Sequence, residues 1–223
     1  METKRNGRTM IEHKDLITTV NRAITEAVSR KSRLPPEAAT IRGMTSPKIR
    51  HLLNNLCAMP NTVYVEMGLY KGATFVAALA GNEDTVKTAY GIDNWSLFPS
   101  HLPRERFWEH HAKYLSAFGS RLHIHDTSLF DISPDAIAEP VTIFYYDADH
   151  IHTHKAVLKF LPRLADPCII ILDDWSRPEI RNDWEKIKAE VTVHKEWELY
   201  SYVKDDLDHW WCGLFLAVIT KKQ

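Results

Sequence analysis

The sequence predicts an α/β protein with a doubly wound, mainly parallel sheet, helices at the N-terminus and an antiparallel strand pair at the C-terminus. Three observations predict this fold. Short apolar runs alternate five times with segments of helical spacing, which is typical of a parallel sheet covered on both faces. The first run leads through Gly68 and Gly72 into a helix. Residues 196–220, centred on residues 205–208, predict the antiparallel pair.

Helices are predicted before the sheet. Apolar side chains such as Leu16 and Val20 recur at helical spacing over residues 11–31, and a second helix is predicted around residues 49–58. Two prolines, in the segment 34–37, mark the break between them. We expect residues 1–60 to form a helical appendage of the same domain as the core, residues 61–223.

The alternation fixes the order of the remaining elements. The predicted parallel strands are residues 62–65, 89–92, 122–125, 141–146 and 168–172. The predicted helices are residues 75–80, 107–118, a short one opened by Ser133-Pro134, 153–164 and 178–191.

Composition narrows the classes of function. The 223 residues are 44% hydrophobic, enough for one domain with a proper core. A net charge of -1 gives no general attraction to nucleic acid or to membranes, and the longest apolar runs are too short to span a bilayer. The charged N-terminus does not resemble a secretion signal, and the three cysteines are widely spaced. We therefore expect a cytoplasmic protein that binds neither nucleic acid nor membrane.

Each predicted parallel strand is followed by an acidic residue. These acids are Glu66, Asp93, Asp126, Asp147 and the pair Asp173-Asp174. The carboxyl ends of parallel strands meet at the edge where open α/β sheets bind ligands. Helix capping explains one or two of them, such as Asp126, but not every one. Like charges repel, so we expect a cationic group among them; the acid at the first strand end suits an amine or hydroxyl better than a phosphate.

Four motifs, in this order, resemble the class I S-adenosylmethionine-dependent methyltransferases. They are Glu66-x-Gly68-x-x-x-Gly72-x-Thr74, Tyr90-Gly-Ile-Asp93, Phe144-Tyr-Tyr-Asp-Ala-Asp-His150 and Ile171-Leu-Asp-Asp-Trp175. The nearest likeness is to the small O-methyltransferases related to macrocin and catechol O-methyltransferases. The resemblance implies a Rossmann-like core and methyl transfer to a hydroxyl of a small molecule or sugar.

The resemblance also implies where the cofactor S-adenosyl-L-methionine binds. Glu66 and the turn from Gly68 through Gly72 to Thr74 would hold its amino-acid part. Asp93 would accept hydrogen bonds from the ribose hydroxyls, and Asp126 and Ser128 are candidates for the adenine side. An acid at this distance from a glycine turn is also found in dinucleotide sites, so a non-methylating NAD- or nucleotide-binding protein is an alternative.

Asp147, Asp173 and Asp174 resemble the metal ligands of the divalent-cation-dependent O-methyltransferases. Oxygen ligands from adjacent strand ends suit Mg²⁺, which would lower the pKa of a bound acceptor hydroxyl. Asp147 is the candidate ligand and base. The alternative is a metal-free enzyme in which the two adjacent aspartates cap the next helix and His150 is the general base.

Three further expectations concern the surroundings of this site. The histidines at positions 150, 152 and 154 have a spacing that a metallohydrolase could use, but a helix opening there would make their side chains diverge. Trp95 is expected near the cofactor and Phe98 in the core. The expected partners are a hydroxylated small-molecule acceptor and a second copy of the chain, bound through the N-terminal helices.

Overall fold

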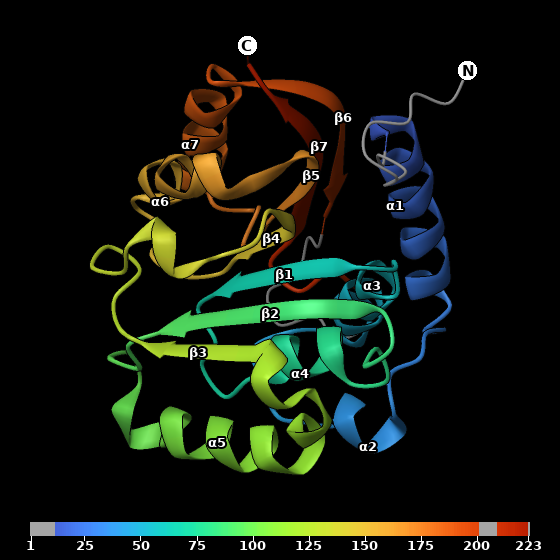
Figure 1. The fold of residues 1–223 in the computed structure, drawn as a ribbon, viewed down its shortest axis with the longest axis vertical. Coiled ribbons are helices and arrows are strands. Elements are labelled where there is room, and N and C mark those ends of the chain that lie inside the picture. The colour runs from blue at the N-terminus through green and yellow to red at the C-terminus, as the bar shows by residue number, and fades with distance from the viewer. Residues whose placement is uncertain (1–11, 201–208, 223) are drawn as a thin grey trace.

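A seven-stranded sheet with the order β3-β2-β1-β4-β5-β7-β6 forms the centre of the molecule, as a computed structural model of residues 12–200 and 209–222 describes it (Figure 1). The strands are β1 (Thr62–Met67), β2 (Val86–Asp93), β3 (Leu122–Asp126), β4 (Val141–Tyr146), β5 (Leu164–Leu172), β6 (Val191–Leu199) and β7 (Leu214–Lys221). The first five strands pair in parallel, and β7 pairs antiparallel to both β5 and β6. The predicted fold class is confirmed.

Helices fill the connections between the strands. They are α1 (His13–Val28), α2 (Pro36–Ala39), α3 (Pro47–Cys57), α4 (Ala73–Leu79), α5 (Pro103–Tyr114), α6 (Thr153–Phe160) and α7 (Pro178–Lys188). Several begin with proline, whose fixed φ suits the first helical position and whose missing N–H is not needed there. At the start of α3, the Ser46 hydroxyl also accepts a hydrogen bond from the Ile49 N–H.

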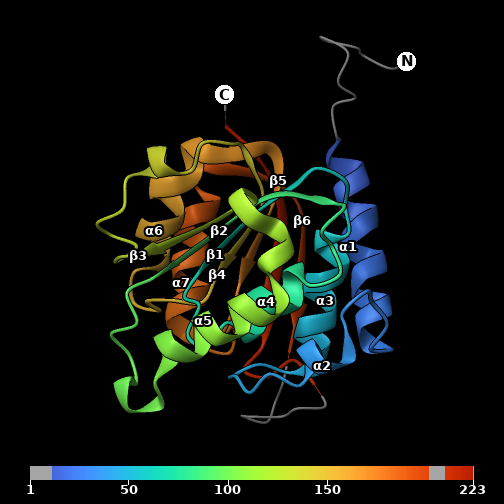
Figure 2. The same ribbon diagram turned by 60° about the horizontal axis from the view of Figure 1, so that its bottom comes forward.

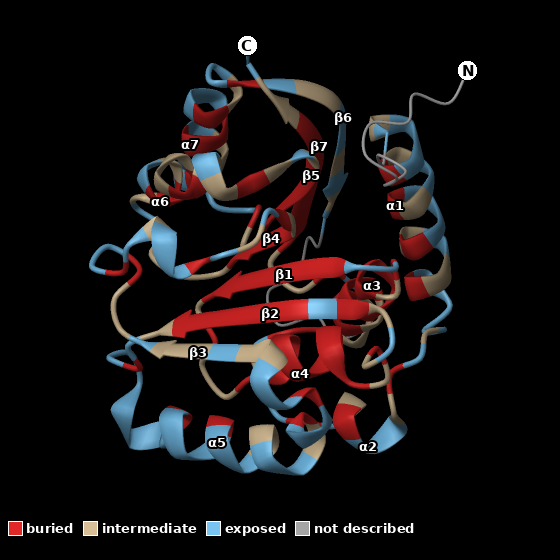
Figure 3. Ribbon diagram, viewed as in Figure 1, coloured by how far each residue is buried: buried red, intermediate tan, exposed pale blue. Residues whose placement is uncertain are grey.

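The two faces of the sheet carry two hydrophobic cores. Because successive residues of a strand point to opposite faces, Tyr64 and Tyr145 pack with α1, α3 and α4, whereas Val65 and Phe144 pack with α6 and α7. Figure 2 shows these helices on opposite sides of the sheet. Figure 3 shows the buried residues concentrated in the central strands. This burial on both sides explains why the strands have continuous apolar runs.

Several predicted boundaries are wrong in detail. The first strand continues through Met67, so Glu66 lies inside β1 and not just after it. The predicted helix 107–118 begins at Pro103 and ends at Tyr114, followed by a 3-10 segment. β6 begins at Val191, earlier than predicted, because the preceding helix ends at Lys188. Residues 205–208, the expected centre of the last strand pair, lie outside the described residues.

The N-terminal helices pack on the same core as the sheet. Leu16 and Val20 of α1 and Leu53 of α3 belong to the apolar cluster that includes Tyr64 and Val218. The division of the domain at residue 60 stays a prediction. Across the described residues, every helix is too short or too polar to cross a membrane.

Candidate active site at the carboxyl edge of the sheet

Four acids meet on one face of the sheet at its carboxyl edge. Glu66, Asp93, Asp147 and Asp173 stand at the ends of β1, β2, β4 and β5, which are neighbours in the sheet. The alternation of side chains along each strand directs all four toward the face covered by α3 and α4. The expectation that the acids gather at one edge is therefore met for these four and for Asp126, which ends β3 in register with Asp93.

Backbone hydrogen bonds hold the strand ends together beyond the last regular pair. The Asp147 N–H donates to the Met67 carbonyl at 2.8 Å, and the Asp173 N–H donates to the Tyr146 carbonyl at 3.0 Å. The acids are therefore positioned by the rigid sheet and not by mobile loops.

Glu66 is completely buried. Its Oε2 accepts a hydrogen bond from the Tyr64 hydroxyl at 2.5 Å, and its Oε1 accepts one from the Thr74 hydroxyl at 2.6 Å. Burial raises the pKa of Glu66 to about 8; the two hydrogen bonds oppose this rise, and the negative charges of Asp173 and Asp93 add to it. A cationic ligand group beside Glu66 would shift its carboxyl group to the charged form.

The loop after β1 passes close to the neighbouring strand end. Gly68 has φ +92°, and a Cβ at this position would overlap the carbonyl oxygen of Asp147. Gly72 has φ +79°, and its Cβ would lie 2.8 Å from the ring of Phe107 on α5. Glycine is therefore required at both positions, for conformation and for space. We call the segment from Gly68 to Gly72 the glycine loop.

Asp93 holds the glycine loop against the end of β2. Its Oδ2 accepts hydrogen bonds from the N–H groups of Leu69 at 2.7 Å and Tyr70 at 2.8 Å. Its Oδ1 accepts one from the Trp95 N–H at 2.7 Å. A carboxylate has about four lone-pair sites, so with three N–H donors bound Asp93 keeps about one site for a ribose hydroxyl. Ribose binding by Asp93 stays a prediction.

Asp126 and Ser128 lie at the end of β3. Asp126 is the strand neighbour of Asp93 in the backbone register of β2 and β3. Its carboxylate accepts a hydrogen bond from Nε of Arg104 at 2.7 Å and lies 2.7 Å from Nη2 of the same side chain. Arg104 thus supplies a cationic group next to the acids at this end of the edge. The Ser128 hydroxyl accepts a hydrogen bond from the Phe130 N–H at 3.2 Å and shapes a local turn. Their contact with adenine stays a prediction.

Asp147 and Asp173 follow the neighbouring strands β4 and β5, and the pKa of each is raised. Asp147 is half-buried, and desolvation raises the pKa of its carboxyl group well above the usual value, with the charges of Asp173 and Asp174 adding to the rise. Burial likewise raises the pKa of Asp173 to about 7, and the charge of Asp174 adds to the rise. Asp173 accepts hydrogen bonds from the Tyr145 hydroxyl at 2.5 Å and from the Asp174 N–H at 2.8 Å.

Asp174 is oriented differently from its two predicted partners. It has φ +54°, and its Oδ2 lies 3.2 Å from Nε2 of His150 and 3.9 Å from Nη1 of Arg177. Over residues 12–200 and 209–222, no three His, Cys, Asp or Glu side chains are arranged to hold a metal ion. In place of the predicted triad, the structure has the half-buried Asp147 next to the buried Asp173, while Asp174 is paired with a histidine.

Comparisons with known proteins fit this geometry. A family model described as a methyltransferase domain, methyltransferase 24, matches residues 65–175, which contain all four acids of the edge. The chain belongs to this methyltransferase family. A search of curated proteins gives no match.

Solved structures share the fold of the methyltransferase. An O-methyltransferase from Bacillus cereus in complex with SAH has a TM-score of 0.59 at 14% identity, with 91% of each chain covered. The O-methyltransferase TomG from Streptomyces achromogenes, in complex with SAM, has a TM-score of 0.56 at 13% identity over 95% of this chain and 100% of that one. A putative RNA methyltransferase from Pyrococcus horikoshii has a TM-score of 0.56 at 13% identity over 90% and 96%. At these identities the likeness shows the fold alone.

In the methyltransferase, His150 lies next to the acids of the edge. Burial lowers its pKa, and the nearby charge of Asp174 opposes this change. The ring is therefore mainly neutral at neutral pH and can accept a proton. His152 instead contacts Asp149, with Nδ1 2.8 Å from its carboxylate, and His154 contacts Asp183 on α7, so the three histidines diverge as expected.

Sequence reasoning missed the tyrosines that support the acids. Tyr64 donates to Glu66, and Tyr145 donates to Asp173 on the adjacent strand. The sequence does contain a signal for them, because Tyr64-x-Glu66 and Tyr145-x-Asp147 put each tyrosine on the same strand face as an acid.

Of the two aromatic residues considered after β2, one lies in the expected surroundings and the other does not. Trp95 is buried, and its Nε1 donates to the Tyr70 carbonyl at 2.9 Å, so it lies against the glycine loop. Phe98 was expected in the core, and this prediction is wrong, because Phe98 is 48% exposed. It lies on a surface loop, where its ring is next to the rings of Tyr70 and His101.

Proposed function

We propose that the protein transfers the methyl group of S-adenosyl-L-methionine to a hydroxyl oxygen of a small-molecule acceptor. The observation that carries this proposal is the row of four acids on one face of the carboxyl edge, next to the glycine loop, within the segment that matches the methyltransferase family. Such an edge suits a ligand with an ammonium group, a sulfonium group and ribose hydroxyls. The SAH and SAM complexes of the similar O-methyltransferases support the same cofactor.

The chemistry follows from positioning and proton removal. The acceptor oxygen forms a bond to the methyl carbon as the carbon–sulfur bond breaks, and the electron pair stays on sulfur. The sheet edge would hold the two reactants in line, and proximity of this kind supplies much of the rate. An alcohol also needs a base nearby to take its proton, and Asp147 and His150 are the two candidates in this part of the site.

A divalent cation fits two of the three predicted ligands. Asp147 and Asp173 are close enough for each charge to act on the other, and Mg²⁺ often binds through one or two carboxylates together with water. Asp174 is paired with His150 and is not part of this fit. When bound, Mg²⁺ would lower the pKa of the acceptor hydroxyl. We propose it as a cofactor on this basis.

Calorimetry with S-adenosylhomocysteine and with NAD tests the cofactor. We expect heat of binding with the first ligand and none with the second, and Asp93→Ala should weaken binding about tenfold or more. The matched control is Asp84→Ala, which removes an exposed carboxylate paired only with Arg33. Binding of NAD in place of S-adenosylhomocysteine would reject methyl transfer.

A second experiment separates metal-assisted transfer from transfer that uses His150 as the base. Methylation of hydroxylated acceptors by labelled cofactor is measured with Mg²⁺ and with EDTA. If a metal acts, EDTA and Asp173→Asn should each lower the rate about a hundredfold. Full activity in EDTA, with a comparable loss in His150→Ala, would instead support the metal-independent reaction.

A further inference from the structure

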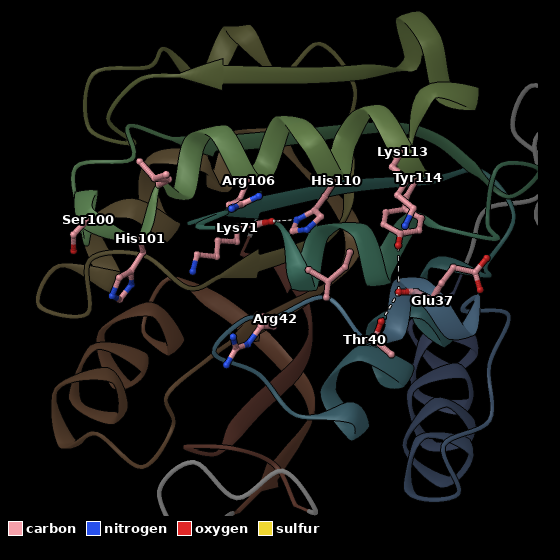
Figure 4. A pocket seen from close by; sticks show the side chains of 12 residues that line it. Glu37, Thr40, Arg42, Lys71, Ser100, His101, Arg106, His110, Lys113 and Tyr114 are labelled. Carbon is pink, nitrogen blue, oxygen red and sulfur yellow. Dashed lines mark hydrogen bonds between the residues drawn. The ribbon is translucent and has the colours of Figure 1, made fainter.

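A cavity of about 610 Å³ lies between α5 and the segment after α2, beside the glycine loop (Figure 4). Its volume falls in the range of small-molecule sites. None of Glu66, Asp93, Asp147 and Asp173 lines it, so the cavity is distinct from the acidic edge.

The lining of this cavity is strongly basic. Its cationic side chains are Arg42, Lys71, Arg106 and Lys113, and it also contains His101 and His110. Glu37 is the one acid among the described lining residues. Figure 4 shows Glu37 at the end near Tyr114, opposite the end formed by His101. We call this site the basic cavity.

Most of these cations lack a protein counter-ion. Arg106 pairs with Glu109 at 2.6 Å. Within the part of the chain that the structure describes, no carboxylate forms an ion pair with Arg42, Lys71 or Lys113. Lys71 and Lys113 lie over the rings of Tyr70 and Tyr114, and the charge of Glu37 also acts on Lys113, but these contacts do not neutralise the three cations. The cavity therefore has a positive potential that attracts an anion.

The cavity is connected to the glycine loop. A second cavity of about 300 Å³ shares Arg42, Lys71 and His101 with the first and adds Tyr70. The Tyr70 N–H donates to Asp93, and His110 Nδ1 lies 2.8 Å from the Lys71 carbonyl oxygen. The loop that borders the acidic edge therefore also forms a wall of the basic cavity.

We propose that the basic cavity binds the phosphate or sulfate ester of the acceptor, so that the acceptor is an anionic, hydroxylated small molecule. This assignment rests on the proposed methyl transfer. Arginine and lysine together match the charge and geometry of an oxyanion ester, with the guanidinium supplying paired donors. The ester fixes one end of the acceptor while its hydroxyl points toward the edge.

The cofactor itself does not fit this cavity. S-adenosylmethionine has one carboxylate against an ammonium and a sulfonium group, so the three lining cations without an ion-pair partner would repel it on balance.

RNA is disfavoured as well. An RNA-binding face needs an extended run of available cations. Here Arg33, Arg104 and Arg163 outside the cavity are each paired with an aspartate, and the net charge of the chain is -1.

Calorimetry with pyrophosphate, at low ionic strength and without metal, tests the assignment. The double variant Arg42→Gln/Lys113→Gln removes two exposed cations from the cavity, and Lys14→Gln/Arg22→Gln removes two exposed cations from α1 as the matched control. We expect the first variant to raise the Kd for pyrophosphate about tenfold and the control to change it less than about twofold. Saturating S-adenosylhomocysteine should leave pyrophosphate binding intact.

Several results would overturn the assignment. Absence of pyrophosphate binding to a protein that binds S-adenosylhomocysteine would reject the basic cavity while the proposed methyl transfer stands. Equal losses in the two double variants, or displacement of pyrophosphate by S-adenosylhomocysteine, would also reject it. Tighter binding of a single-stranded RNA dodecamer, weakened by the same cavity variant, would reassign the cavity to RNA. If the protein does not bind S-adenosylhomocysteine, both the proposed methyl transfer and the proposed role of the basic cavity are rejected.

Discussion

At the scale of single residues, burial of the acid Glu66 lowers the stability of the folded protein. Glu66 has no contact with water, and its two oxygens accept hydrogen bonds from Tyr64 and Thr74. Burial raises its pKa from 4.5 to about 8. Burying a carboxylate that has two hydrogen-bond donors but no cation beside it destabilises the folded protein. Residues with such perturbed pKa values are often found at binding sites.

Glu66→Gln should stabilise the protein in a pH-dependent way. The folded-state pKa is above the unfolded value, so the stability linked to the protonated form is fully present below pH 4.5 and is lost as the pH rises through about 8. Because glutamine stays neutral, its advantage in the free energy of unfolding should grow by about 3 kcal/mol between pH 5 and pH 8. Urea unfolding at both pH values measures it, with the exposed Glu190→Gln as control. An advantage that is the same at both pH values would contradict this account.

Gly68→Ala should be far more costly than Gly119→Ala. Both glycines have positive φ, at +92° and +53°, but only at position 68 would a Cβ overlap a backbone atom, the carbonyl oxygen of Asp147. At position 119 no heavy atom lies within 4 Å of the added Cβ. We expect a loss of about 3 kcal/mol or more at position 68 and about 1–2 kcal/mol at position 119, where only the backbone conformation, φ +53° and ψ −128°, opposes a side chain. Equal losses in denaturant unfolding would show that the close approach is not limiting.

At the scale of elements, buried asparagines join α3 to α4. Asn54 of α3 donates from Nδ2 to the carbonyls of Ala77 and Ala80, at 2.8 and 2.9 Å. Asn82 donates from its own Nδ2 to the carbonyls of Asn54 and Ala78. These bonds satisfy carbonyls at the end of α4 that the helix cannot pair itself. The helix that follows the glycine loop is thereby fixed against its neighbour.

Asn54→Ala should destabilise the protein by about 2–4 kcal/mol, because it leaves two buried carbonyl groups without their donors and a small cavity in the core. Lys48→Ala, on the same helix at a partly exposed position, should cost less than about 0.5 kcal/mol. Thermal and urea unfolding of both variants measure the difference. A loss at position 54 no larger than at position 48 would mean that water replaces the lost donors.

At the scale of the whole molecule, the acidic edge and the basic cavity both border the glycine loop. The acids of β1, β2, β4 and β5 lie on one side of the glycine loop, and the basic cavity under α5 lies on the other. A cationic cofactor and an anionic acceptor would each find the opposite charge, and they would meet at the loop. The net charge of -1 gives no sign of this separation, because acidic and basic residues nearly cancel when they are summed over the chain.

Cofactor binding should stabilise the entire domain, since the edge is built from four strands of the central sheet. S-adenosylhomocysteine at about 100 times its Kd should raise the free energy of unfolding by about 2.7 kcal/mol, and thus Tm by roughly 5–10 °C. NAD at the same concentration should leave Tm unchanged. Differential scanning calorimetry of the full chain measures both, and an equal rise with NAD would argue against the assigned cofactor.

The sheet and the gathering of acids could be predicted because both depend on local patterns. Buried strands have continuous apolar runs in the sequence. Because the carboxyl ends of neighbouring parallel strands lie at one edge, the acids there were expected near one another; these are Glu66, Asp93, Asp147 and Asp173. Boundaries were less certain, because tertiary pairing extends β1 past Glu66.

The partner of each acid was decided only by the tertiary structure. Nothing local distinguishes Asp126, which pairs with Arg104 on a separate helix, from Asp93, which binds backbone N–H groups of the glycine loop. Likewise Arg42 and Lys113 are seventy-one positions apart and share a cavity only because α5 packs over the chain after α2. The sequence determined the fold class and the acidic edge through periodicity. Hydrogen-bond partners, pKa values and the basic cavity arise from contacts between distant segments, for which periodicity carries no information.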